Sequence, residues 1–248
     1  MDGILKLSKW FGIPLLFIYI FSMVITPFFA GDWHYVQTVW ERWQALNVGI
    51  VALVGSLIAL NISAYLANNQ REREFRAARA HLPSALGQLN NYTKLSAVYY
   101  KKAWRSLNEK TTFNESPPDE PENYQQVFTE CIRHAPPNVG DWLAKIIKDL
   151  QTHSVLMTKL RSDFENPSLP VLTRYNLIGY TYELGRLQAL INRLSSFAKG
   201  EDNFVGGSIT QKDFELAHSV IGINIDSFSA KIPDSDKVLS LRGLIEGR

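Results

Sequence analysis

The sequence predicts an all-α protein in which two apolar helices precede a helical bundle. Three observations predict this class. Two uncharged apolar segments lie at about 10–30 and 47–67. Apolar residues then recur at helical spacing through most of the remaining chain. Runs of alternating Val, Ile and Thr between turn residues, which would indicate strands, are few.

Each apolar segment is long enough to cross a bilayer, because about 20 apolar residues span a hydrocarbon core of roughly 30 Å. Lys6 and Lys9 precede the first segment, as they would in a secretory signal peptide. Phe28 and Ala30 do not form the small-x-small cleavage site that such a peptide needs, so we favour an uncleaved anchor. Residues 1–67 are therefore predicted to form a transmembrane hairpin.

Basic residues near the span ends predict the orientation of the hairpin, since they tend to stay in the cytoplasm. They precede the first span and follow the second, whereas only Arg42 lies between the spans. Both termini are therefore expected in the cytoplasm. The connecting loop, 31–46, is expected to form a short interfacial helix because it is rich in aromatic rings, at Trp33, Tyr35, Trp40 and Trp43.

Residues 68–232 are predicted to form the helical domain. Its helices are marked by apolar residues at 86–99, 143–160, 172–197 and 214–228. Pro83 is expected to interrupt the helix that leaves the second span. Three segments are expected to separate helices: an exposed acidic loop at 108–122, a proline-containing turn at Asn166, Pro167 and Pro170, and a glycine-containing segment at 200–207.

The last helix is expected to stop near Pro233, leaving a poorly ordered tail at 233–248. This tail ends in Ile-Glu-Gly-Arg, the tetrapeptide cut by a clotting protease that is used to remove purification tags. We exclude those four residues from functional reasoning.

Small residues form a stripe along one side of the second span. Such a stripe lets another helix approach closely, and in lipid this packing drives helix association. Two partners fit the pattern: the first span of the same chain, or the second span of another copy. The residues that define the stripe are Gly49, Ala52, Ser56, Ala59 and Ser63, with Ala45 before them.

Asn61 lies off this stripe, on a face that it shares with Asn47 and Asn68. An amide in hydrocarbon usually faces protein or a water-filled cavity. One interpretation pairs Asn61 with a hydroxyl of the first span, Ser22 or Thr26. The other gives the span two interaction faces, which permits a ring of copies with Asn61 beside a pore.

Four arginines follow the second span: Arg71, Arg73, Arg76 and Arg79. They are interpreted as lipid-headgroup contacts, since each basic residue near an anionic surface contributes about 1 kcal/mol. The alternative is a solvated helix face with an i, i+4 pair between Glu72 and Arg76. The two interpretations are compatible.

No catalytic, cofactor-binding or metal-binding motif is present, so the chain is predicted not to be an enzyme. Cys131 and His134 are close in sequence, but no second Cys-His pair completes a metal site. A net charge of +2 and the lack of basic clusters with interleaved aromatics predict no contact with nucleic acid. Most of the tyrosines at 92–100 and 175–182 are expected in the core, and any exposed ones would suit a protein partner.

A short two-span hairpin followed by a cytoplasmic helical domain resembles bacterial inner-membrane proteins, including membrane effectors of anti-phage systems such as retron-associated toxins. The resemblance lies in the layout, and no residue role is carried over. It implies a protein whose bundle senses or binds a partner and whose hairpin oligomerises and permeabilises the inner membrane. The alternatives are a passive anchor or scaffold subunit and, less favoured, a membrane-bound enzyme.

Overall fold

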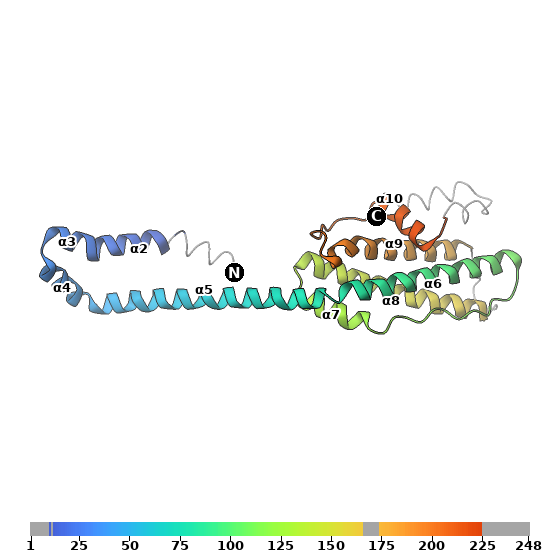
Figure 1. Ribbon diagram of the computed structural model, residues 1–248, viewed down its shortest axis with the longest axis horizontal. Helices are drawn as coiled ribbons and strands as arrows, with labels where there is room; N and C mark the ends of the chain where they lie inside the picture. The colour runs from blue at the N-terminus through green and yellow to red at the C-terminus, as the bar shows by residue number, and fades with distance from the viewer. Residues whose placement is uncertain (1–9, 11, 166–173, 225–248) are drawn as a thin grey trace. The chain divides into compact units, whose positions relative to one another are not determined.

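The computed structural model describes residue 10 and residues 12–165 and 174–224. Every regular element in these ranges is a helix, which confirms the all-α class (Figure 1). The chain divides into two compact units, Met1–Asn69 and Gln70–Arg248. Their boundary falls inside one continuous helix, α5 (Gln44–Arg79).

The first unit contains α2 (Ile13–Ile20), the π-helical turn η2 (Phe21–Ile25), α3 (Thr26–Ala30), α4 (Trp33–Arg42) and the first part of α5. Helix α4 is the short helix expected in the connecting loop. Asp32 caps its N-terminus, where the Asp32 Oδ1 accepts a hydrogen bond from the Tyr35 N–H at 3.0 Å. Helix α5 then begins at Gln44 and continues past Ala67, without a break, to Arg79.

Pro27 explains how α4 is attached to η2. Proline has no N–H, so the carbonyl of Met23, four residues earlier, receives no hydrogen bond from it. The indole Nε1 of Trp40 donates to that carbonyl at 2.9 Å. An aromatic ring expected at the bilayer interface thus also satisfies a backbone group of the preceding helix.

The second unit is a helical bundle. It contains the end of α5 together with α6 (Leu82–Glu109), α7 (Tyr124–His134), α8 (Pro137–Glu165), α9 (Arg174–Lys199) and α10 (Gln211–Ile221). Helix α9 packs against α6, α8 and α10. The core has two clusters of buried side chains, one around Leu89, Leu143 and Leu190 and one around Tyr100, Leu160 and Leu184.

Two of the helix boundaries predicted from proline and glycine residues are observed. Helix α5 ends at Arg79, and α6 starts at Leu82 with Pro83 in its first turn, where a missing N–H leaves no hydrogen bond unmade. The segment 200–207 separates α9 from α10. Residues 166–170 and the tail 233–248 lie outside the described residues.

The final helix is shorter than expected. Gly222 follows Ile221 with a φ of 67°, a left-handed conformation that ends α10. Ile225 and Phe228, expected on the same helix, lie outside the described residues. Ile223 folds back into the core and is only 4% exposed.

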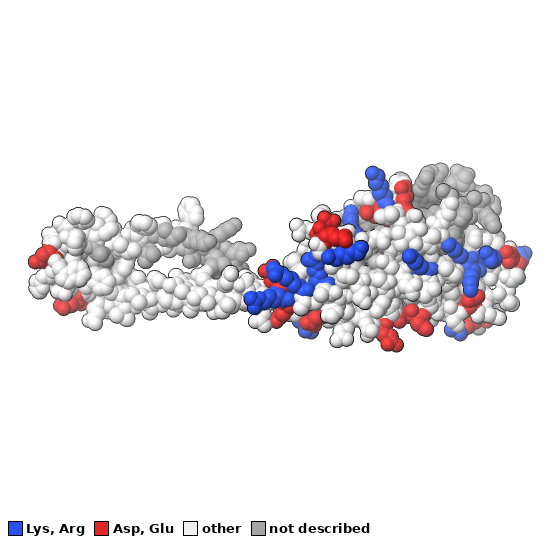
Figure 2. All heavy atoms as spheres, in the orientation of Figure 1, with Lys and Arg blue, Asp and Glu red and all other residues white. Residues whose placement is uncertain are grey.

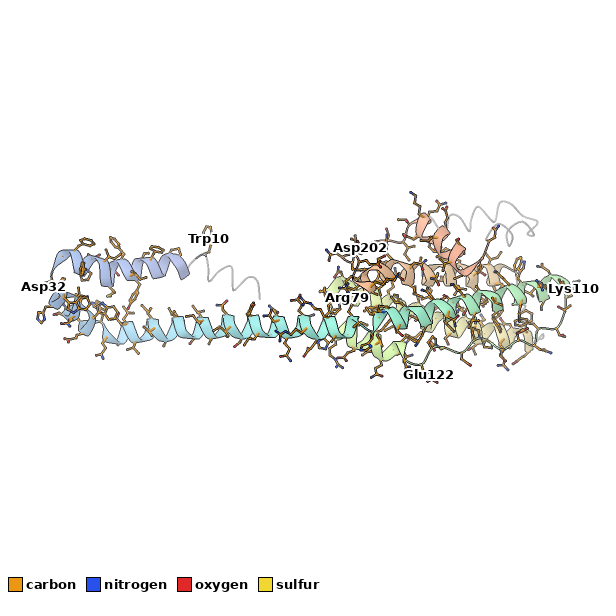
Figure 3. All side chains as sticks on the ribbon, in the orientation of Figure 1. Trp10, Asp32, Arg79, Lys110, Glu122 and Asp202 are labelled. Atoms are coloured by element: carbon orange, nitrogen blue, oxygen red, sulfur yellow. The ribbon has the colours of Figure 1, made fainter. Side chains whose placement is uncertain are left out.

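Two features between α6 and α8 differ from expectation. Helix α7 was not predicted. The loop between Lys110 and Glu122 (Figure 3) is not wholly solvated, because Phe113 is buried and its ring centroid lies 4.6 Å from that of Phe164. This contact fixes the loop to the second core cluster.

Candidate functional site

The apolar part of α5 is the first component of the candidate site. The helical run Gln44–Glu109, which comprises α5 and α6, is the one run in the described residues that is long and apolar enough to cross a membrane. Only 6% of its most apolar 18-residue window is buried, unlike the core helix of a soluble protein. Residues 44–69 carry no Asp, Glu, Lys or Arg, and their visible surface is uncharged (Figure 2). Phe17–Ala30 is a shorter apolar helix.

The small-residue stripe on this helix is open. Its members are all exposed, and a Cβ added at Gly49 would meet no atom within 4 Å. The described part of the first apolar segment therefore leaves the stripe uncovered. The exposed members are Gly49, Ala52, Ser56, Ala59 and Ser63.

Asn61 makes no hydrogen bond to any described residue of the first apolar segment. Its Nδ2 donates to the Leu57 carbonyl of its own helix at 2.8 Å. Ser22 and Thr26, the hydroxyls considered as its partners, donate instead to the carbonyls of Tyr19 and Phe21. Asn61 is exposed, and its amide is partly satisfied within α5.

The amide that does join the helices is Asn47, which is 6% exposed. Its Oδ1 accepts a hydrogen bond from the Tyr19 hydroxyl at 2.7 Å, and its Nδ2 donates to the Trp40 carbonyl at 3.4 Å. With the bond from Trp40 to Met23, these contacts tie α2, η2, α4 and α5 together. The sequence placed Asn47 on the face of Asn61 but did not single it out.

Arg71 joins the end of α5 to α7. Its Nε and Nη2 donate to the carbonyls of His134 and Ala135 at 3.2 and 3.0 Å. The last carbonyls of a helix have no partner within it, and a cation there also opposes the helix dipole. Nδ1 of His134 lies 3.0 Å from Oε2 of Glu74, which adds a second link between the same helices.

Phe75 and Arg79 join the next turn of α5 to α9. The ring of Phe75 stacks on that of Phe197 with centroids 6.3 Å apart, and the Arg79 guanidinium lies 4.3 Å from the centroid of the Phe197 ring. We call the six residues that hold this part of α5 the α5 anchor: Arg71, Glu74, Phe75, Arg79, His134 and Phe197.

The four arginines expected at lipid headgroups thus have different surroundings. Arg71 and Arg79 contact the bundle. Arg76 pairs with Glu72, which confirms the expected i, i+4 pair. Arg73 is exposed and makes no ion pair with any described residue.

Cys131 and His134, the residues considered for chemistry, have different surroundings on α7. Burial raises the pKa of the Cys131 thiol to about 11, which disfavours the nucleophilic thiolate. His134 faces Glu74 and Glu130. Among the described residues, no three His, Cys, Asp or Glu side chains are grouped so that they could hold a metal ion. Of the tyrosines at 92–100 and 175–182, Tyr92, Tyr99, Tyr100 and Tyr180 are buried in the core.

Comparison of the chain with protein-family models, curated proteins and solved structures gave no match.

Proposed function

We propose that this chain is a bacterial inner-membrane interaction protein, in which the bundle binds a protein partner and α5 carries the effect of binding to the bilayer. The observation that carries the proposal is the division of α5. Its first part is apolar and exposed, and its last part is held in the bundle by the α5 anchor. A change that loosens or tightens the α5 anchor acts directly on a helix that continues into the apolar segment.

The proposed membrane topology has two spans with both termini in the cytoplasm. The apolar helix Phe17–Ala30 forms most of the proposed first span. In α4, the aromatic side chains of Trp33, Tyr35 and Trp40 are exposed. Such residues are favoured at the bilayer interface. The cluster at Gln70–Arg79 then holds the cytoplasmic end of α5 beside anionic headgroups, through exposed residues that include Arg73 and Arg76.

The proposed response to partner binding is oligomerisation through the open stripe, followed by permeabilisation. A stripe of small side chains left uncovered within one chain is available to another copy of α5. Asn61 then lies beside the pore.

A passive anchor or scaffold is the second candidate function. It is favoured by Asn61, whose amide already bonds within its own helix and needs no water-filled pore. The two candidates share the same parts and differ only in membrane activity.

Membrane potential in cells that overproduce the full chain tests the proposal. We expect depolarisation that is lost in Gly49→Leu, because a large side chain covers the stripe. Gly55→Leu is the matched control: its added side chain also meets no neighbour within 4 Å but lies off the stripe, so depolarisation should persist. Asn61→Leu should abolish leakage while leaving the chain inserted.

Normal potential with wild-type chain, together with a bound protein partner, would favour the passive anchor. Recovery of the chain in the soluble fraction would contradict both candidates.

A further inference from the structure

Helix α6 presents a basic strip on its exposed face. We define the strip by Lys94, Leu95, Val98, Lys101, Lys102 and Arg105, which are all exposed. At 100° per residue they fall within an arc of about 120°, and they extend for about 17 Å along the helix. Figure 2 shows Lys and Arg side chains grouped over the C-terminal half of α6.

Within the described part of the chain, one of the strip's four cations has an ion-pair partner. Lys102 pairs with Glu115 at 2.8 Å, but Lys94, Lys101 and Arg105 make no ion pair with any described residue. The only acidic residue of α6 is Glu109, one turn beyond the strip. Among the described residues, the acidic loop pairs with the strip only through Glu115, while Phe113 packs its ring against Tyr99 and Phe164.

The centre of the strip is apolar. Leu95 and Val98 are 49% and 47% exposed. Val98 lies between Lys94, one turn earlier, and Lys101, one turn later. Apolar side chains between cations are expected to bind a partner surface that has both carboxylates and apolar side chains. Phosphates of a nucleic acid would leave Leu95 and Val98 uncovered.

The position of the strip favours a protein over lipid headgroups. It begins about 18 Å along α6 from Leu82, beyond the turn that follows α5. The arginines expected at headgroups all precede that turn. A soluble partner reaches the strip without competing with the bilayer.

We infer that the basic strip of α6 docks an acidic amphipathic segment of a different protein, with apolar residues on Leu95 and Val98 and carboxylates on Lys94, Lys101 and Arg105. Complementary charge of this kind steers association and suppresses wrong partners. The inference rests on the proposed function, in which the bundle binds a partner, and names the surface and chemistry of that contact.

Site-specific photocrosslinking tests the inference in the full-length chain in its own membrane. The crosslinking amino acid replaces Val98, and the control position is Val155 on α8, which is 67% exposed and lies outside the strip. We expect a protein adduct at position 98 but not at 155, with the crosslinked peptide of the partner carrying net negative charge.

Charge reversal provides the second measurement. The combined change Lys94→Glu, Lys101→Glu and Arg105→Glu should lower the adduct yield at least about tenfold, since a loss of 1.4 kcal/mol in binding is tenfold. The control with the same change in net charge is Lys148→Glu, Lys159→Glu and Lys212→Glu, three exposed residues without an ion pair among the described residues. Lysines introduced at the partner's acidic positions should restore the adduct.

Equal yields at positions 98 and 155, or no loss on charge reversal, would overturn the inference. An adduct only to nucleic acid, lipid or a second copy would overturn it as well. A partner that crosslinks elsewhere on the bundle overturns this inference alone, because the proposed function is tested separately by depolarisation.

Discussion

At the scale of single residues, His153 is the most unusual group in the bundle. Its ring lies edge-on to those of Tyr92 and Tyr100, with centroids 5.6 and 5.7 Å apart. Nδ1 contacts the Tyr100 hydroxyl at 3.2 Å, and Nε2 is buried without a hydrogen-bond partner. Burial lowers the pKa of His153 from 6.5 to about 4, because the core does not solvate the imidazolium.

Acid should therefore destabilise the bundle. The unfolded chain binds a proton at His153 below about pH 6.5 and the folded chain only below about 4. The free energy of unfolding should then fall by about 3 kcal/mol as pH drops through this window. Urea unfolding of the full chain in detergent, followed by circular dichroism, measures this loss.

His153→Gln is the control for acid sensitivity, since its side chain keeps a polar partner for Tyr100 but binds no proton. The variant should show a flatter pH dependence than wild type. His218, whose pKa is also lowered by burial, should account for part of the slope that remains. An unchanged slope in His153→Gln would contradict this role of His153.

Gly185 is required by a close approach between α9 and α10. A Cβ added there would lie 2.3 Å from Cε1 of His218, whose Nδ1 is held by the Phe214 carbonyl at 2.8 Å. Gly185→Ala should destabilise the full chain by about 1–3 kcal/mol, as overpacking does. Thermal unfolding of the detergent-solubilised chain measures the loss.

Gly87→Ala is the matched control, because a Cβ added at that helical position meets nothing within 4 Å. That variant should gain about 0.5–1 kcal/mol through its helix propensity. Equal effects of the two substitutions would show that His218 does not restrict the space at Gly185.

At the scale of elements, the sequence of α7 has the apolar period of a helix, although no helix was predicted there. Tyr124, Val127, Phe128 and Cys131 follow helical spacing, and three of them are fully buried. This period is short and follows a proline-rich segment, so the sequence predicts α7 less strongly than the longer helices. The end of α10 was missed for a different reason: apolar residues continue past Gly222, although its left-handed conformation ends the helix.

The α5 anchor could not be predicted from local patterns. Arg71 and the carbonyls that it caps are 63 and 64 residues apart in the chain. A basic residue after an apolar span fits lipid, solvent or a distant helix end equally well. Only the packing of α5 against α7 and α9 distinguishes Arg71 and Arg79 from Arg73.

Arg71→Ala should loosen the end of α5. The variant loses two hydrogen bonds from a charged donor, and because Arg71 is partly solvated we expect a cost of about 1 kcal/mol. Amide hydrogen exchange at residues 70–79 should then rise about fivefold. Arg73→Ala is the control, since Arg73 makes no ion pair with a described residue, and equal exchange in both variants would contradict the role of Arg71.

At the scale of the whole molecule, the fold class and the long apolar helix could be predicted from the distribution of apolar and charged residues. Helical periodicity and the absence of charge at 44–69 were sufficient for the all-α class and for a membrane-length helix. The uncovered stripe, the contacts of Asn47 and the α5 anchor depend on which helices meet, and that depends on packing between distant segments. The identity of a protein partner cannot be predicted from local sequence patterns in a chain without recognisable motifs.

The central claim is that α5 crosses a bilayer while the bundle stays in the cytoplasm. Cysteine labelling suits the test, because the one native thiol, Cys131, is fully buried and should not react. New cysteines replace the exposed residues Gln37 in α4, Leu53 in α5 and Gln211 in α10.

With a membrane-impermeant thiol reagent, position 37 should be labelled in cells whose inner membrane is intact. Position 211 should be labelled only after that membrane is opened, and position 53 should resist the reagent in both cases. Labelling of positions 37 and 211 from the same side, or ready labelling of position 53, would contradict membrane crossing by α5.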